Sequence, residues 1–257
     1  MTVAVNDLVD RAEEEYGDTA NDRISAATWI KFLNAASKDI AKRTVALGVR
    51  PAYSKTTNVV TVAGFLQSLP SDGLKVMDIH RNMGRTWVTG TAYKIDDAVF
   101  NSSTRYVALT NHTAGNFTTD LGNNKWVASP LEAGPAIQQI NYHNLINTVG
   151  DFWSLDADDL SEIRFWIPVD NDRTQWYCYP PQPNTAHLMY VEMTYAALPA
   201  NASAGGNIVL RDEYEEAILL YMLYRGHSID DDIIESSVNP RSRQYFQAYL
   251  TDPAFLL

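Results

Sequence analysis

One segment, residues 67–84, constrains the fold more than any other part of the chain. It contains a strong turn, Pro70-Ser71-Asp72-Gly73, followed by a strand pattern from Leu74 to Arg81. The pattern that continues this segment resumes only at Gly134, after residues that have the composition of a small β module. We therefore expect one domain opened at a hairpin to accept another, with a division into residues 1–84, 85–133 and 134–257.

Helical patterns occupy both ends of the chain. Apolar residues recur at helical spacing in four places: residues 6–16, the stretch between Ser25 and Gly48, residues 213–224, and a last helix that starts near Pro240 and breaks before Pro253. Gly226 is expected to end the third helix, and residues 228–232 to form an acidic loop after it.

The middle of the chain is dominated by strand patterns. They cover residues 56–69, 74–81, 135–140, 163–169, 174–179 and 187–197, with a short helix-like segment at 142–148. Tight turns at 170–172 and 180–184 join the last three strands, which predicts an antiparallel meander. The expected fold class is α+β: a helical bundle packed on an antiparallel sheet or meander, with a small all-β inserted module.

Composition limits the classes of protein that the chain fits. Hydrophobic residues make up 46% and charged residues 20% of the chain, as in soluble globular proteins. No apolar run approaches the length of a membrane helix and the start lacks a secretory signal, so we expect a soluble protein that stays where it is made. The net charge of −11 opposes a tight grip on nucleic acid but suits a surface past which DNA slides.

The residues that carry enzyme chemistry form no recognised pattern. Motifs for nucleotide, zinc or serine-hydrolase sites are missing, and the histidines are scattered. The acidic runs at 156–159 and 230–232 lack the glycine and distal glutamate of a calcium loop. Cys178, between two tyrosines, is expected to be a structural thiol in a packed sheet. We expect no catalytic residue, metal or cofactor, although carboxylate pairs for glycoside hydrolysis meet only in a fold and stay open.

An ordered set of segments resembles the head-to-tail adaptor, or connector, proteins of tailed bacteriophages. The segments span about four fifths of the chain and read SAATWIKFLNAASKDIAKR, VAGFLQSLPSDGLKVMDIHRNMG, GPAIQQINYHNLINTVGDFW, RFWIPVDNDRTQWYCYPPQP, LRDEYEEAILLYMLYRGHSIDDD and SRQYFQAYL. The resemblance implies a non-enzymatic virion protein that joins the portal to the tail nozzle or tube. It implies a ring of twelve copies around a DNA channel at the head–tail junction, assembled in the cytoplasm of a bacterial host.

The C-terminal tip is apolar and ends in Phe255, Leu256 and Leu257. Exposed apolar residues need a partner, so one reading is that the tip inserts into the portal. The other reading, equally favoured by the sequence, is that the tip folds back on its own helix.

Residues 85–133 resemble a carbohydrate-binding module of the chitin-binding type. The matching positions are Trp87, Tyr93, Asp97, Val99, Tyr106, Ala108, His112, Gly115 and Trp126, while Asp96 replaces the usual glycine and Leu109-Thr110 an exposed aromatic pair. The resemblance makes Trp87, Tyr93, Tyr106 and Trp126 candidates for contact with glycan or tail fibres. A small β module also needs its aromatic residues as a core, and we rank that role first for Tyr106 and Trp126.

The sequence leaves three candidate functions for the chain. The preferred one is a structural head-to-tail adaptor. The rival is a carbohydrate-binding or glycan-processing protein that uses the inserted module. The third is a tail-completion or fibre-attachment protein elsewhere on the virion.

Overall fold

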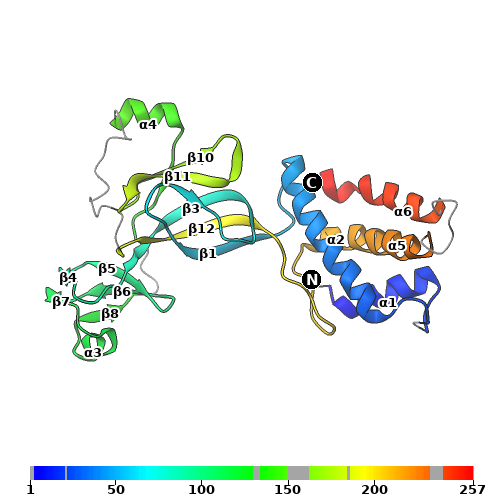
Figure 1. The fold of residues 1–257 in the computed structure, drawn as a ribbon, viewed down its shortest axis with the longest axis horizontal. Coiled ribbons are helices and arrows are strands. Elements are labelled where there is room, and N and C mark those ends of the chain that lie inside the picture. Colours follow the sequence, from blue (N-terminus) through cyan, green and yellow to red (C-terminus); the bar gives the residue numbers. More distant parts are fainter. Residues whose placement is uncertain are drawn as a thin grey trace. The chain divides into compact units, whose positions relative to one another are not determined.

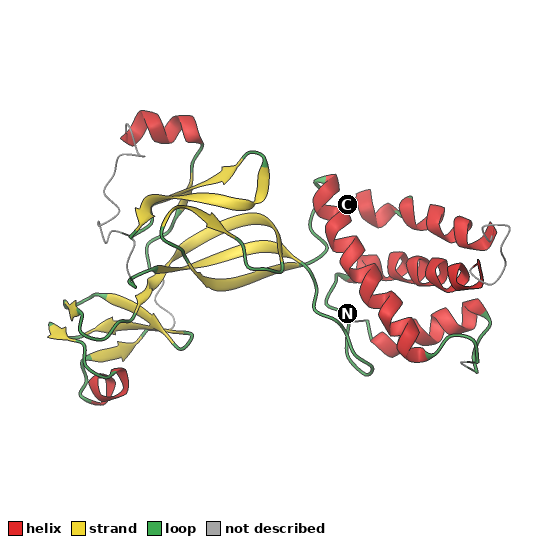
Figure 2. Cartoon of the chain, in the orientation of Figure 1, coloured by secondary structure: helices red, strands yellow, loops and turns green. Residues whose placement is uncertain are grey.

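The computed structural model of the chain describes residues 3–20, 22–129, 134–149, 162–183, 186–231 and 240–256. The acidic run 156–159, Asp232 and Leu257 lie outside the described residues. The chain forms two compact units, residues 1–54 with 196–257, and residues 55–195. Helices make up the first unit, and strands dominate the second (Figure 1, Figure 2). The fold is therefore α+β, as the sequence predicted.

The helical unit is built from the two ends of the chain. Its elements are α1 (Val5–Tyr16), α2 (Ala26–Leu47), α5 (Glu215–Asp231), α6 (Pro240–Leu250) and the 3-10 turns Asp212–Tyr214 and Pro253–Leu256. Gly17 and Gly48 end α1 and α2 with φ of 83° and 75°, the left-handed conformation that glycine adopts without a steric penalty. The predicted stop at Gly48 is thus confirmed.

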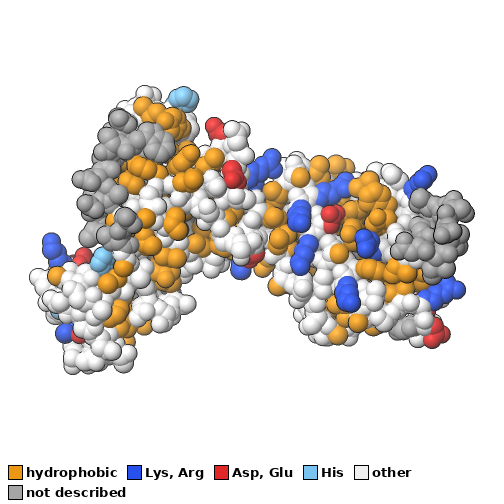
Figure 3. All heavy atoms as spheres, viewed as in Figure 1, with side chains coloured by type: hydrophobic (Ala, Val, Ile, Leu, Met, Phe, Trp, Pro, Cys, Tyr) orange, Lys and Arg blue, Asp and Glu red, His pale blue; other side chains and the backbone are white. Residues whose placement is uncertain are grey.

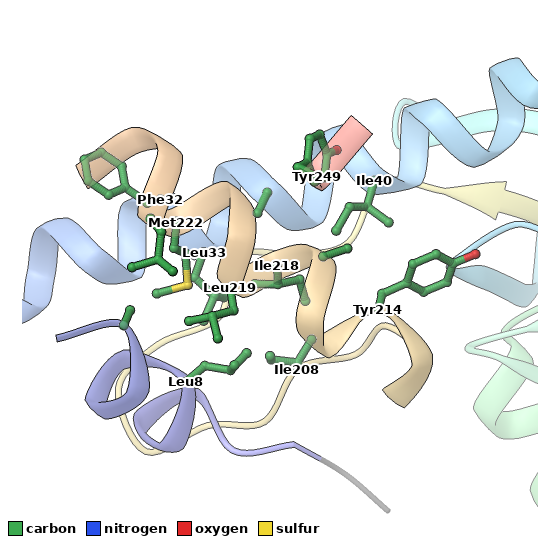
Figure 4. Close-up of a cluster of buried hydrophobic side chains, with 14 of the residues drawn as sticks. Leu8, Phe32, Leu33, Ile40, Ile208, Tyr214, Ile218, Leu219, Met222 and Tyr249 are labelled. Atoms are coloured by element: carbon green, nitrogen blue, oxygen red, sulfur yellow. The ribbon is translucent and has the colours of Figure 1, made fainter. Parts of the chain in front are cut away.

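One core holds these helices together. Figure 4 shows Leu8 of α1, Leu33 of α2 and Ile218 of α5 among the side chains that gather between the helices. All three are at most 1% exposed. Trp29, which begins the apolar stripe of α2, is also fully buried, so it is a core residue.

The predicted end of the third helix is wrong. Gly226 does not stop α5, which continues to Asp231, so the described residues of the expected acidic loop, from Ser228 onward, are helical. A Cβ at position 226 would lie 2.6 Å from Cη2 of Trp29. The glycine is therefore there for close packing of α5 on α2, and its role is not visible from the spacing within one helix.

The second unit contains two larger sheets and a two-stranded ribbon. The six-stranded sheet has the order β1 (Ser54–Val60), β12 (Met189–Ala197), β3 (Gly73–Thr86), β5 (Ala98–Asn101), β6 (Thr104–Ala108), β8 (Trp126–Ala128). The four-stranded sheet has the order β2 (Gly64–Ser68), β11 (Asp172–Gln182), β10 (Phe165–Val169), β9 (Gln138–Gln139). The ribbon is β4 (Ala92–Tyr93) with β7 (His112–Thr113), and the helices are α3 (Phe117–Gly122) and α4 (Tyr142–Val149).

The predicted meander holds for two of its three strands. β10 and β11 form an antiparallel hairpin in which Trp166 lies opposite Cys178. β12 leaves this sheet and lies between β1 and β3 in the other one. Pairing of β12 with strands more than a hundred residues earlier is a long-range choice that local turn patterns do not encode.

The strand β3 crosses the predicted start of the inserted module. It continues to Thr86, and its last residues pair in parallel with β5, so that Arg85 lies opposite Val99. Strands of residues 85–133 therefore extend the same sheet that contains β1 and β12. The division at residues 84 and 133 stays a prediction.

Candidate interaction surfaces

The junction where the chain returns from the module is built on Asn82. This side chain is fully buried, and its amide group donates to the carbonyl oxygens of Pro135 (3.2 Å) and Ile163 (2.8 Å) and accepts from the backbone N–H of Ile163 (3.1 Å). Gly134 approaches so closely that a Cβ there would lie 2.1 Å from the carbonyl oxygen of Asn82. Asn82 thus ties together two returning segments that are far apart in the sequence.

The four aromatic residues singled out in the module come together in one cluster. Tyr93 and Trp126 are 6% and 2% exposed, and their rings meet edge to face with centroids 5.1 Å apart. Trp87 and Tyr106 are half-buried and pack against Phe117 of α3, at 5.5 Å and 4.9 Å. These rings form the core of the module, the role that the sequence analysis ranked first for Tyr106 and Trp126.

Polar contacts fix the loops around this cluster. The carboxylate of Asp120 is 4% exposed and accepts hydrogen bonds from Nζ of Lys125 (2.7 Å) and the N–H of Gly115 (2.8 Å). The Lys125 bond, followed by the Gly115 bond, holds the pKa of Asp120 below its usual range. The hydroxyl of Tyr93 accepts from the N–H of Val88 (2.9 Å), and burial raises the pKa of that hydroxyl.

Asp96, which replaces a glycine in the predicted resemblance, has a glycine-like backbone conformation. Its φ is 70°, in the left-handed region that glycine favours and that aspartate enters more readily than most residues. The backbone conformation at this position is therefore one that a glycine would adopt, although the side chain is an acid.

The C-terminal tip divides into a buried and an exposed part. Phe255 is 3% exposed, and the guanidinium of Arg43 lies 4.5 Å from the centre of its ring. Arg43 also donates to the carbonyl of Leu250 (2.7 Å), which attaches the end of α6 to α2. Leu256 is 83% exposed. The side chain of Phe255 belongs to the helical core in this conformation, and Leu256 is the described residue at the tip that is free to reach a partner.

Tyr249 anchors the same region from α6. Its hydroxyl donates to the carboxylate of Asp39 (2.5 Å), and the ring is 1% exposed. Burial, reinforced by Asp39, raises the pKa of this hydroxyl well above its usual range, so it stays a hydrogen-bond donor at physiological pH.

An exposed apolar turn was missed by the sequence analysis. Val60, Val62 and Leu66 are 42%, 54% and 43% exposed at the connection between β1 and β2. The buried amide of Gln67 braces this turn, because it accepts from the N–H of Val62 (2.7 Å) and donates to the carbonyls of Val62 (2.8 Å) and Gly64 (3.1 Å). The residue spacing predicted strands here but did not indicate which side chains would stay exposed to solvent.

Within the described ranges, no group of three or more His, Cys, Asp or Glu side chains is placed to hold a metal ion. The described residues that line a hollow between α4 and the β10–β11 hairpin include one carboxylate, Asp170, and one histidine, His143. Among the described helices, none has the length and apolar character needed to cross a membrane.

Cys178 is the buried thiol that the sequence predicted. It is 1% exposed on β11, and burial raises the pKa of the thiol to about 12. The protonated thiol is therefore the form present at neutral pH, which makes it a packing residue rather than a nucleophile.

The features described so far are packing clusters, braced turns and exposed apolar positions on two compact units. The family comparison is specific: the family model described as SU10 adaptor protein matches residues 3–253. The chain belongs to this family and is a structural adaptor protein of a bacteriophage virion. No curated protein matches the chain. The resemblance to phage adaptors is thus confirmed at the level of the family, and the resemblance of residues 85–133 to a carbohydrate-binding module stays a prediction.

Proposed function

We propose that this chain is a head-to-tail adaptor whose copies form a ring, of twelve in the simplest case, between the portal and the tail nozzle or tube. The observation that carries the proposal is the adaptor-family match over residues 3–253, which includes both compact units. The ring is assembled in the cytoplasm of a bacterial host and becomes part of the head–tail junction of the virion.

The charge of the chain supports a role beside passing DNA. With 31 acidic and 20 basic residues, the net charge of −11 repels phosphates. Tight DNA binding depends on clustered Lys and Arg that displace counterions from the phosphate backbone. A channel lined by such subunits lets the genome pass without holding it.

Two surfaces suit the protein partners of such a ring. Leu256, exposed at the C-terminal tip, is proposed to insert into the portal, with Leu257 beyond the described residues. The module of residues 85–133 is proposed to contact tail fibres. Because Tyr93 and Trp126 lie in its core, that contact uses the outer surface of the module, including the half-buried Trp87 and Tyr106.

The proposed role is non-enzymatic, and the aromatic residues in the described part of residues 85–133 do not favour the glycan-binding alternative over it. Stacking on a sugar requires an exposed aromatic face. Tyr93 and Trp126 are buried edge to face, and Trp87 and Tyr106 are half-buried against Phe117.

The test is assembly with the portal protein encoded by the same phage. Purified chain is mixed with portal particles, and the product is examined by electron microscopy and by mass measurement. Rings of the chain stacked on the portal are expected. A chain that stays monomeric with and without portal, and that is retained on chitin or cell-wall glycan, would overturn the proposal in favour of the carbohydrate-binding function.

A further inference from the structure

The helix α2 carries a row of lysines on its outer side. Lys31, Lys38 and Lys42 follow one another at spacings of seven and four residues, which places them on one face of the helix. Lys31 and Lys42 are exposed and Lys38 is half-buried. Figure 3 shows basic side chains along α2 on the visible face of the helical unit, with few acidic side chains beside them. We call this row the lysine face.

The lysine face has no ionic partner inside the described part of the helical unit. The ion pairs formed there join Arg11 with Glu215 and Glu216, and Arg211 with Glu213. Asp39, which follows Lys38 in the sequence, accepts a hydrogen bond from the hydroxyl of Tyr249. The three ammonium groups are therefore available for a partner of opposite charge outside the unit.

The helix α1 carries the complementary row. It consists of three exposed residues at spacings of three and four, which are Asp7, Asp10 and Glu14. The ion pairs among the described residues do not involve them. Arg11, the one basic residue of α1, is already paired with α5. We call this row the acidic face.

We propose that the lysine face of one copy docks on the acidic face of the next copy around the ring. The proposal rests on the ring stated under Proposed function. A closed ring needs two different, mutually complementary faces on each subunit, and these two helices supply them. Lys38 and Lys42 are one helical turn apart, as are Asp10 and Glu14, so each pair spans about 6 Å along its helix. Two ammonium groups can therefore face two carboxylates in register.

DNA phosphate is the other polyanion that a lysine row could meet. The observations favour the protein partner, because three lysines in one row form a small patch and because a matching acidic row exists on the same chain. Loss of DNA binding without loss of ring formation is kept as an outcome of the test.

The experiment reverses each face and then mixes the variants. Lys38→Glu with Lys42→Glu gives a chain with two acidic faces, and Asp10→Lys with Glu14→Lys gives a chain with two basic faces. Asp7 is kept, because a carboxylate in the first turn stabilises the helix. Each variant alone is expected to need about tenfold or more protein to fill rings on portal particles, since like charges then face each other.

The decisive measurement is ring formation on portal particles by an equimolar mixture of the two variants. The copies can alternate, so that every contact again joins a basic with an acidic face, and a ring with an even number of copies closes. The same recovery is expected when all four substitutions are combined in one chain. A matched control, Lys94→Glu with Arg164→Glu, changes the charge equally on exposed side chains of the other unit and should assemble like the unmodified chain.

The outcomes separate this inference from the proposed function. If the unmodified chain forms no ring on the portal, the proposed function fails. If it forms rings and both reversed variants form them equally well, or lose only DNA binding, the lysine–acid contact is overturned while the adaptor stands. Circular dichroism of each variant before mixing shows that it is folded, and a variant that is unfolded is replaced by the combined four-substitution chain, whose failure to assemble would equally overturn the contact.

Discussion

Gly226 of α5 and Trp29 of α2 are in direct contact, with Cη2 of the indole 2.6 Å from the position that a Cβ on residue 226 would occupy. Because glycine has a hydrogen in place of a Cβ at position 226, α5 and α2 can approach this closely. Trp29 is fully buried and also packs against Tyr16 and Phe32, so the indole can move away only by displacing other core side chains.

Gly226→Ala is therefore expected to destabilise the helical unit by about 1–3 kcal/mol, the usual cost of overpacking a core. The sign of this change in unfolding free energy is informative, because alanine in place of glycine inside an uncrowded helix stabilises the protein by about 0.5–1 kcal/mol. Urea unfolding followed by far-UV circular dichroism measures the difference. Gly122→Ala, at a helical position with open space around it, is the control and should be neutral or slightly stabilising. Equal or greater stability of Gly226→Ala would contradict this account of the contact.

Gly226 also illustrates what the sequence can and cannot specify. Gly17 and Gly48 end helices through their own backbone conformation, which is a local property that spacing detects. Gly226 has a tertiary role, and the residue that explains it lies almost two hundred positions earlier. The same distinction separates the β10–β11 hairpin, predicted from its turn, from β12, whose partners are set by long-range packing.

The packing of the residues proposed as contacts was predictable to a similar extent, whereas their contact with a partner stays a prediction. The aromatic positions of the module identified the residues that cluster around Trp126, because a small β unit has few other groups from which to build a core. The apolar turn at Val62 was not predictable, since exposure depends on what covers a strand and not on the strand pattern. The split of the tip into buried Phe255 and exposed Leu256 likewise depends on Arg43, far away in the sequence.

Asn82→Ala should destabilise the sheet unit by about 2–4 kcal/mol. The substitution leaves the buried N–H and carbonyl of Ile163 without the partner that the Asn82 amide supplies, and each unsatisfied buried group costs about 1–3 kcal/mol. Urea unfolding gives the size of the loss, and limited proteolysis shows whether the segments near Gly134 and Ile163 become accessible first. Asn147→Ala, on the exposed side of α4, is the matched control and should have little effect. If Asn82→Ala and Asn147→Ala resist proteolysis equally well, the junction does not depend on the Asn82 side chain.

The stability of the module is expected to depend on pH through Asp120. Its folded pKa lies below the ordinary 3.8, so its contribution is fully present above pH 3.8 and is lost as the pH falls through the folded value. Asp120→Asn removes the charge and the ion pair with Lys125. The difference in unfolding free energy between the two proteins should therefore be largest near neutral pH and shrink below about pH 4. A difference that is constant across this range would mean that the charge of Asp120 has no part in it.

The thiol of Cys178 should be inert until the protein unfolds. Its folded pKa of about 12 exceeds the ordinary 9.0, so the unfolded state loses the proton first and this group lowers stability as the pH rises above 9. At pH 8, a thiol reagent is expected to label native protein very slowly and urea-unfolded protein rapidly. Fast labelling of the native protein would show that the sheet opens around β11.

Leu256→Asp tests the proposed portal contact without disturbing the fold. Leu256 is 83% exposed, so an aspartate there should leave the urea midpoint within error, whereas it places a charge in any apolar pocket that receives the tip. Removal of the last four residues is a poorer experiment, because it also removes Phe255 from the helical core and from Arg43. Binding to portal particles is expected to weaken about tenfold or more for Leu256→Asp. Val209→Asp, at another exposed apolar residue of the same unit, supplies the control for added surface charge. Unchanged portal binding by Leu256→Asp would place the contact elsewhere on the chain, since no pocket closed around the tip would accept a carboxylate at that position without loss.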